Sequence, residues 1–373
     1  MKRNNRFAKL AAIAVTSIIN LLLSAQGDNS INTAILAPLT IFGTQEELFN
    51  QTGSGYIIEQ DLIQTHGYAD INQALKQVPG VYLRTEDGYG LFPNISLRGV
   101  DPGRMSKLTY MEDGILAAPA SYSAPSAYYT PTMGRMSALE VLKGSSQIEH
   151  GPHTTGGVIN YISTPIPHRK SHYIRFSYGT DNETKLHMWT GDRIKTDAGE
   201  FGYLIETYHR ENDGFKTIDS TEDFDGTSRD TGLQNRDSMV KLSWSPGTEN
   251  RQYFELKTGY TDKDANETYL GLSSSDFAAN PNRRYGASRD DNMDTQHFRN
   301  YLRYSVEINP QATFSAAAYY NAFNRNWFKL KEIKDVDSDG DGIIDSTPTV
   351  KLYQALAGID DNKPLEVLKG TRA

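Results

Sequence analysis

The feature that most constrains the fold of this 373-residue chain is a series of strand-like runs in its second half. After Pro167, apolar and polar residues alternate, as in Ile174–Tyr178, where Arg175 and Ser177 separate the apolar side chains. A period of two places successive side chains on opposite faces of a β-strand. The pattern predicts seven strands with one apolar and one polar face, near residues 171–179, 183–191, 200–210, 236–245, 251–261, 295–308 and 311–328.

The lengths of the connections distinguish two architectures. Short turns at one end of the strands and long loops at the other are typical of an outer-membrane β-barrel, whereas a soluble β-sandwich has no reason to sort its loops by side. We therefore expect residues 168–373 to form the first strands of an antiparallel transmembrane β-barrel. The short linkers are 192–199, 246–250 and 309–310; the long ones are 211–235, 262–294 and the segment from 329 onward; only 180–182 breaks this order.

The N-terminus has the organisation of a secretory signal peptide. Met1–Lys9 contains four basic side chains and no acid, and the apolar stretch Leu10–Leu23 follows directly. This stretch is shorter than the ~20 apolar residues of a membrane-spanning helix, and Ala25–Gly27 fits a cleavage site. We expect export with removal of residues 1–27; an uncleaved N-terminal anchor is the alternative.

Composition excludes several classes of function. The net charge of −8 opposes binding to nucleic acid, whose phosphates require a basic surface. The chain contains no cysteine, so disulfides, thiol chemistry and cysteine-linked lipid anchors are excluded. Its 22 tyrosines suit the interfacial girdles of an outer-membrane barrel, although a large soluble β protein can show the same excess.

Two regions precede the predicted strands. Residues 28–55 are polar and aperiodic, which predicts a flexible tail. Within the tail, the β-forming patch 38–44 suits strand addition to the sheet edge of a partner; a loose strand packed on its own domain is the alternative. In 56–167, a helix capped by Asp70 and a series of short strand-like runs predict a small α+β domain.

Six motifs, in this order, resemble the TonB-dependent outer-membrane receptor family. They are Leu39–Thr44, Asn72–Val81, Ile95–Gly99, Asp113–Ile115, Glu140–Gly144 and Gly156–Asn160. The resemblance implies an α+β plug domain inside a barrel of about 22 strands, of which this chain supplies only the N-terminal part. It also implies that the inner-membrane partner TonB pulls on a TonB box formed by Leu39, Thr40, Ile41, Phe42 and Gly43.

Three further stretches, His150–Gly157, Glu267–Leu272 and Asn280–Tyr285, resemble the ferric-citrate receptor branch. This resemblance implies import of a ferric siderophore across the outer membrane, with ferric citrate or a similar carboxylate chelate as the first expectation. Vitamin B12, a nickel chelate or an oligosaccharide are alternative cargoes. A non-transporting, calcium-binding surface protein is the alternative from a different class.

The family resemblance also suggests site residues. Arg98 and Lys143 resemble the basic residues that latch family plugs to barrel glutamates; the alternative is that both are solvated in a wet lumen. Lys143 departs from the commoner arginine, which weakens bidentate pairing. For the ligand, we expect an exposed aromatic cluster together with loop arginines that meet an anionic chelate. These candidates are Tyr122, Tyr128, Tyr129, Arg104, Arg283 and Arg284.

An acidic stretch near the C-terminal end matches the front of a calcium loop. Asp337, Asp339, Asp341 and Asp345 stand at positions one, three, five and nine of that pattern. Position twelve is Pro348 in place of glutamate, so we expect a weak calcium site; a solvated acidic loop is the alternative. The sequence shows no zinc-binding pair, phosphate loop or nucleophile motif, so we expect neither enzyme activity nor a required cofactor.

Overall fold

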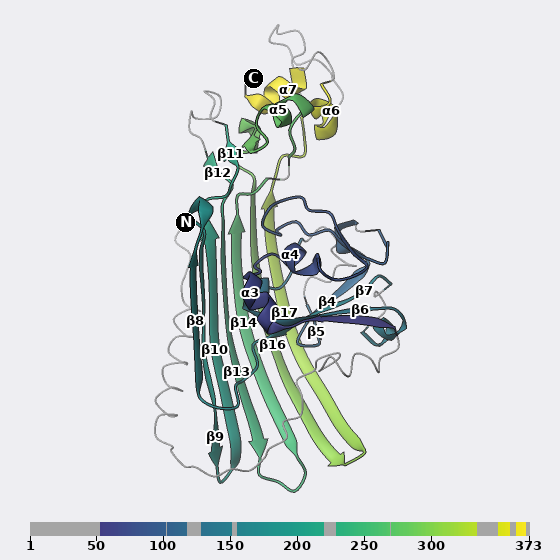
Figure 1. Ribbon diagram of the computed structural model, residues 1–373, viewed down its shortest axis with the longest axis vertical. Coiled ribbons are helices and arrows are strands. Elements are labelled where there is room, and N and C mark those ends of the chain that lie inside the picture. Colours follow the sequence, from purple (N-terminus) through teal and green to yellow (C-terminus); the bar gives the residue numbers. More distant parts are fainter. Residues whose placement is uncertain are drawn as a thin grey trace.

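The computed structural model describes residues 53–101, 103–117, 128–150, 155–219, 229–268, 270–333, 350–358 and 363–370. A small N-terminal domain packs against one face of a long, curved sheet of seven strands, which we call the wall (Figure 1). Among the described residues, no helix is both long enough and apolar enough to cross a membrane.

The N-terminal domain combines a five-stranded sheet with two short helices. Its strands lie in the order β1-β6-β7-β4-β5, with β4 and β7 parallel and the other pairs antiparallel. Asp70 caps α4 as expected, because its carboxylate accepts a hydrogen bond from the Asn72 backbone N–H at 2.7 Å. The elements are β1 (Ser54–Ile58), α3 (Gln60–His66), α4 (Ile71–Leu75), β4 (Leu108–Glu112), β5 (Ile115–Leu116), β6 (Met136–Lys143), β7 (Gly157–Ser163) and a separate pair, β2 (Val81–Leu83) and β3 (Ile95–Leu97).

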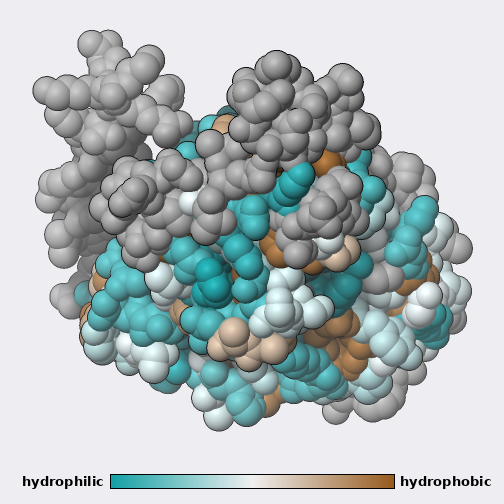
Figure 2. All heavy atoms as spheres, turned by 90° about the horizontal axis from the view of Figure 1, so that it is seen from above, coloured by the Kyte–Doolittle hydropathy of each residue, from teal (hydrophilic) through white to brown (hydrophobic). Residues whose placement is uncertain are grey.

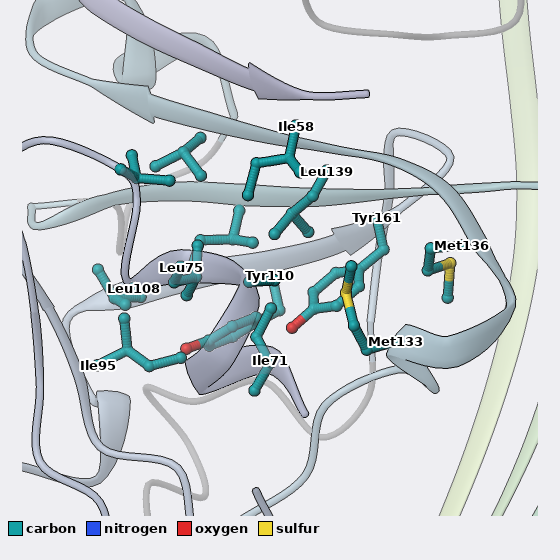
Figure 3. Close-up of a cluster of buried hydrophobic side chains, with 14 of the residues drawn as sticks. Ile58, Ile71, Leu75, Ile95, Leu108, Tyr110, Met133, Met136, Leu139 and Tyr161 are labelled. Carbon is teal, nitrogen blue, oxygen red and sulfur yellow. The ribbon is translucent and has the colours of Figure 1, made fainter. Parts of the chain in front are cut away.

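The core of this domain lies between its helices and its sheet. Figure 3 shows Ile71 and Leu75 of α4 pointing toward Leu139 and Tyr161 of the sheet. These side chains are buried, as are Ile58, Ile95 and Leu108. Burial of aliphatic and aromatic side chains is the main driving force for such a domain, so it has its own folding core apart from the wall.

The wall is an antiparallel meander. Its strands lie in the order β17-β16-β14-β13-β10-β9-β8, so every long strand pairs with its neighbours along the chain. All seven strands expected from the alternating pattern are present, which confirms the predicted fold class. They are β8 (Ser171–Tyr178), β9 (Thr184–Thr196), β10 (Gly199–Asn212), β13 (Leu233–Pro246), β14 (Gln252–Ala265), β16 (Asn292–Asn309) and β17 (Ala312–Phe328).

The two ends of the wall differ. Short hairpins close one end, here called the turn end, and long connections leave the opposite loop end (Figure 1). The loop end carries a small core that includes Leu270, Tyr285 and Leu368. Seen from above, the loop end is mainly hydrophilic with scattered hydrophobic patches (Figure 2). Its elements are β11 (Thr217–Ile218), β12 (Arg229–Asp230), α5 (Ser274–Ala279), β15 (Arg283–Arg284), η7 (Gly286–Ser288), β18 (Glu332–Ile333), β19 (Val350–Lys351), α6 (Leu352–Leu356) and α7 (Lys363–Lys369).

The wall buries its polar face and exposes its apolar face. Lys257 is 2% exposed, whereas its neighbour Leu256 is 44% exposed. On the outward face near the turn end, aromatic rings line up across four strands, with centroid distances of 6.0, 5.5 and 4.6 Å between successive rings. This row consists of Phe201, Trp244, Phe254 and Tyr304. A soluble sheet has the opposite polarity, because water favours polar side chains on the exposed face.

Candidate functional site at the interface between domain and wall

The N-terminal domain presents two adjacent carboxylates to the wall at the tight turn after β4. Asp113 and Gly114 have φ angles of 54° and 75°, the left-handed conformation that reverses the chain between β4 and β5. The turn is fixed by Asn160, whose Oδ1 accepts a hydrogen bond from the Gly114 N–H at 3.0 Å. Glu112 and Asp113 are thereby held side by side and are both buried.

Asp113 is bound from both sides of the interface. Within its own domain, its carboxylate accepts hydrogen bonds from the backbone N–H and the hydroxyl of Ser163, at 2.8 and 2.6 Å. From the wall, the ammonium groups of Lys257 and Lys241 approach to 2.5 and 3.6 Å. Burial alone raises the pKa of Asp113, but these two cations outweigh burial and hold the pKa well below its usual value. The carboxylate is therefore ionised throughout the physiological range.

Glu112 joins the same lysine to two arginines. Its carboxylate lies 2.7 Å from Arg135, 2.6 Å from Lys257 and 3.5 Å from Arg299. Burial again acts to raise the pKa of Glu112, and the surrounding cations, led by Arg135, reverse the effect and lower it.

Asp237 of β13 completes the buried cluster. Its carboxylate lies 2.9 Å from the Arg135 Nε and 2.8 Å from an Arg299 guanidinium nitrogen. Three carboxylates therefore face four cations across the interface, and we call these seven residues the charge network: Glu112, Asp113, Arg135, Asp237, Lys241, Lys257 and Arg299. Removing one partner from such a cluster is costly, because it leaves a desolvated charge behind.

Around the charge network, hydrogen bonds to backbone carbonyls fit the domain closely to the wall. Asn321 donates a hydrogen bond to the Leu116 carbonyl at 2.8 Å, and Arg303 donates one to the Asp113 carbonyl at 2.7 Å. Gly134, in η3 (Met133–Arg135), has no room for a side chain, because a Cβ there would lie 2.3 Å from the Tyr208 hydroxyl. The described residues contain no cluster of three or more histidine or acidic side chains arranged to hold a metal.

The proposed latch residues lie close to each other, Lys143 at the end of β6 and Arg98 directly after β3. Lys143 donates a hydrogen bond to the Pro79 carbonyl at 2.5 Å, and the exposed Arg98 guanidinium approaches Gly144. Burial, followed by the nearby charge of Arg98, lowers the pKa of Lys143. No carboxylate among the described residues pairs with either cation, so their pairing with barrel glutamates stays a prediction.

The expectation of an exposed aromatic cluster is wrong for the two tyrosines that the structure describes. Tyr128 and Tyr129 are 5% and 6% exposed. Tyr128 packs against Phe92 and Trp327 at centroid distances of 5.4 and 5.5 Å. The Tyr129 hydroxyl lies 2.6 Å from the His297 Nδ1. These rings fill the space between domain and wall, where their apolar bodies exclude water and the hydroxyl finds a buried partner.

The candidate loop arginines hold the loop end together. Arg283 lies 2.5 Å from Asp219 and 3.7 Å from Asp276, so it joins three separate segments. Arg284 donates to the Pro281 carbonyl at 3.0 Å. Ligand binding by either residue stays a prediction, as does any ligand contact of Arg104, which lies in η1 (Gly103–Met105).

Other sequence candidates lie outside the described residues. They are Leu39, Thr40, Ile41, Phe42 and Gly43 of the TonB box, Tyr122, and the calcium candidates Asp337, Asp339, Asp341 and Asp345. The strands on either side of the acidic stretch, β18 and β19, pair with each other, and Lys351 forms a 2.8 Å ion pair with Glu332 at this base. Calcium binding stays a prediction.

The charge network itself was missed by the sequence reasoning. Its wall members stand at alternate positions on the polar faces of predicted strands, and Asp113 falls in one of the motifs quoted above. The signal available in the sequence was that these charged residues share the polar faces of the predicted strands. What the sequence did not show is which residue of the N-terminal domain each wall cation meets, because those contacts join residues more than 120 positions apart.

Comparisons with known proteins agree with this architecture. Residues 47–158 match the family described as "TonB-dependent Receptor Plug Domain". Among curated relatives, the vitamin B12 transporter BtuB of Vibrio vulnificus is 26% identical over 38% of this chain and 22% of its own length. The iron-regulated outer membrane virulence protein of Vibrio cholerae is 21% identical over 86% of this chain and 47% of its own length. The chain thus spans less than half the length of these relatives.

Solved structures show the same fold. The ferric citrate transporter FecA in its unliganded form matches with a TM-score of 0.63 and 22% identity, over 78% of this chain and 42% of FecA. The ferric yersiniabactin uptake receptor FyuA of Yersinia pestis matches with a TM-score of 0.58 and 15% identity, over 76% of this chain and 43% of FyuA.

Proposed function

We propose that this chain, which carries a plug domain of the TonB-dependent receptors and the fold of part of their barrel, belongs to an outer-membrane importer of a ferric siderophore. The N-terminal domain is hereafter called the plug. The observation that carries the proposal is the reversed polarity of the wall, which turns apolar side chains outward and buries charged ones against the plug.

A reversed sheet suits a lipid environment. Leu256, Phe298 and Leu302 are exposed on the outward face, where hydrocarbon would solvate them. The aromatic row at the turn end has the position of an interfacial girdle, which anchors a barrel where lipid meets water. On this basis the turn end faces the periplasm and the loop end faces the outside of the cell.

The contacts between plug and wall favour a plug that can be displaced during import over one that closes the pore permanently. An apolar interface would have to expose hydrocarbon to water whenever the plug moved. The charge network, in contrast, consists of groups that water can solvate as they separate, and it adds to the apolar contact that Phe92 and Tyr128 make with Trp327. Movement would begin when TonB pulls on Leu39–Gly43, which precede β1 in the sequence.

Three kinds of resemblance favour an iron chelate. The structures matched are a ferric citrate transporter and a ferric yersiniabactin receptor, and one curated relative is iron-regulated. The sequence motifs of the ferric-citrate branch make ferric citrate or a similar carboxylate chelate the first ligand to test. Vitamin B12 is the second candidate, because two curated relatives carry that name.

The experiment is uptake of radiolabelled iron by cells whose only receptor is the full-length protein that contains this chain. We expect uptake of ferric citrate that requires TonB and the proton-motive force and that unlabelled iron chelates compete away. Uptake of radiolabelled cyanocobalamin by the same cells, with no iron uptake, would replace the first ligand with the second. Uptake that continues without TonB would contradict the proposed function.

A further inference from the structure

Two buried polar atoms between plug and wall make no hydrogen bond and belong to residues that line the same small cavity. They are the Nε2 of His297, on β16, and the Oε2 of Glu112, on the plug. His297 is 1% exposed and Glu112 is 5% exposed, so both side chains are shielded from bulk solvent. Buried polar atoms are normally satisfied, so an unsatisfied pair at one cavity points to an additional group between them.

The other polar atoms of both side chains are already bound, which leaves these two to face the cavity. The Glu112 Oε1 accepts hydrogen bonds from two cations of the charge network, at 2.7 and 2.6 Å. The Glu112 Oε2 lies 3.5 Å from Arg299 without a hydrogen bond. The Nδ1 of His297 is bound to Tyr129, which does not line the cavity, so the imidazole ring reaches the cavity with its opposite edge.

The hydrogen bonds of Tyr129 determine which nitrogen of His297 carries the proton. A guanidinium group can only donate, so the Tyr129 hydroxyl oxygen accepts from Arg299 at 3.4 Å. The hydroxyl proton then needs an acceptor, and among the described residues it meets the His297 Nδ1 at 2.6 Å. A neutral imidazole with an unprotonated Nδ1 carries its proton on Nε2. The cavity is therefore bordered by a donor from the wall and by an acceptor, the Glu112 carboxylate, from the plug.

Size and charge identify the group that fits between this donor and this acceptor. The cavity measures about 20 Å³, which exceeds the ~10–15 Å³ that one water molecule requires. Lys257 and Arg299 also line the cavity and oppose a cation, whereas the Glu112 carboxylate opposes an anion. Empty cavities in proteins are apolar, whereas polar cavities of this size hold water.

We propose that a single water molecule binds between His297 and Glu112, where it accepts a hydrogen bond from the His297 Nε2–H and donates one to the Glu112 Oε2. This inference concerns the contact between plug and wall and does not depend on which ligand is imported. The water completes a ring of contacts that runs from Arg299 through Tyr129 and His297 to Glu112, which itself lies beside Arg299. A water-mediated hydrogen bond is nearly as favourable in enthalpy as a direct one, so His297 holds the plug without touching its carboxylate.

Heteronuclear NMR of the full-length receptor, with isotopically labelled histidine, tests the site directly. We expect His297 to be neutral with its proton on Nε2, and we expect this proton to show cross-relaxation with a long-lived water molecule. His297→Gln identifies the signal by its loss, and the exposed His168 is the internal control that should show no such water. In Tyr129→Phe both tautomers of His297 should appear, because Nδ1 loses its partner.

Hydrogen exchange of the plug peptide 111–117 tests whether this water joins plug and wall. His297→Phe keeps a ring but loses the donor, so the plug carboxylate stays unsatisfied and exchange should become roughly fivefold faster or more. His172→Phe, the same substitution at an exposed position of β8, is the matched control and should leave the exchange of this peptide unchanged.

Three NMR results on the folded wild-type receptor would overturn the water site: a proton on the His297 Nδ1, a doubly protonated ring, or an Nε2–H without a bound water. Wild-type exchange of peptide 111–117 in folded His297→Phe would overturn it too. Because the NMR measurement uses the wild-type receptor, it decides the question even where a variant fails to fold.

Discussion

Replacing Asp113 with asparagine should loosen the plug from the wall. Asparagine has nearly the shape of aspartate and tolerates the left-handed backbone at this position, where φ is 54°. The substitution therefore changes the charge and spares the turn. It leaves Lys257 with Glu112 alone and deprives Lys241 of its 3.6 Å partner.

The expected effect is large because the site is dry. Asp113 and both lysines are less than 5% exposed, so an unpaired ammonium group there is poorly solvated. Breaking a buried ion pair by removing one partner costs about 3–5 kcal/mol. Since 1.4 kcal/mol corresponds to a factor of ten, local opening of β4 and β5 should become at least a hundredfold more frequent.

Hydrogen exchange followed by mass spectrometry on the full-length receptor measures that opening. Peptides covering 108–116 should lose protection in Asp113→Asn, and adding Lys257→Met should restore at least half of it by removing the stranded charge. Asp264→Asn, an exposed acid on β14, is the matched control and should change nothing. Wild-type protection in Asp113→Asn, or no recovery in the double variant, would refute the charge network as the contact that holds the plug.

Three further predictions concern other parts of the chain. Ile41→Pro should abolish TonB-dependent uptake but leave ligand binding unchanged, because proline removes a strand donor far from the loop end; normal uptake would contradict this. Tyr129→Phe should cost about 1–3 kcal/mol by leaving His297 unsatisfied, measurable as a lower thermal midpoint of the receptor. Burial raises the pKa of Glu267 to about 7 despite its partner Lys216. A carboxyl group whose pKa is raised on folding stabilises the folded loop fully below pH 4.5, and this stabilisation is lost as pH rises through 7. Hydrogen exchange in the wild-type loop should therefore become faster between pH 5 and 8, and Glu267→Gln should remove this pH dependence.

The sequence was most informative where local pattern determines structure. The period of two in the second half gave the number and approximate bounds of the wall strands, because one-residue errors would place every side chain on the wrong face. Asp70 correctly marked the beginning of α4. The sequence reasoning missed β1 and α3, since Ser54–Ile58 becomes a strand by pairing with β6, more than 80 residues away.

The site was less predictable, because its residues are defined by contacts between the two parts of the chain. Tyr128 and Tyr129 stand in a loop-like context of small residues, which is typical of exposure, yet the wall covers them. The charged residues of the polar strand faces were likewise consistent with a wet lumen. Only the position of the plug shows that Lys257 meets a carboxylate, whereas Lys263 lies over the Tyr129 ring.

The two levels of charge on the inner face of the wall would have different consequences for the proposed import. At the lower level, Lys241, Lys257 and Arg299 are neutralised by acids, most of them from the plug, so ionic attraction there fixes the plug and an added anion would have to compete with bound carboxylates. At the upper level, Lys263 lies over the Tyr129 ring, and no carboxylate among the described residues is within ion-pair distance of it. Under the proposed import function, a negatively charged ligand arriving from the loop end would meet Lys263 before the neutralised cations of the charge network. Under the same proposal, passage below that level would require the plug carboxylates to leave the wall, which would expose Lys241 and Lys257 to the ligand. A force that displaces the plug, as proposed for TonB, would then also uncover cations along the path of an anion.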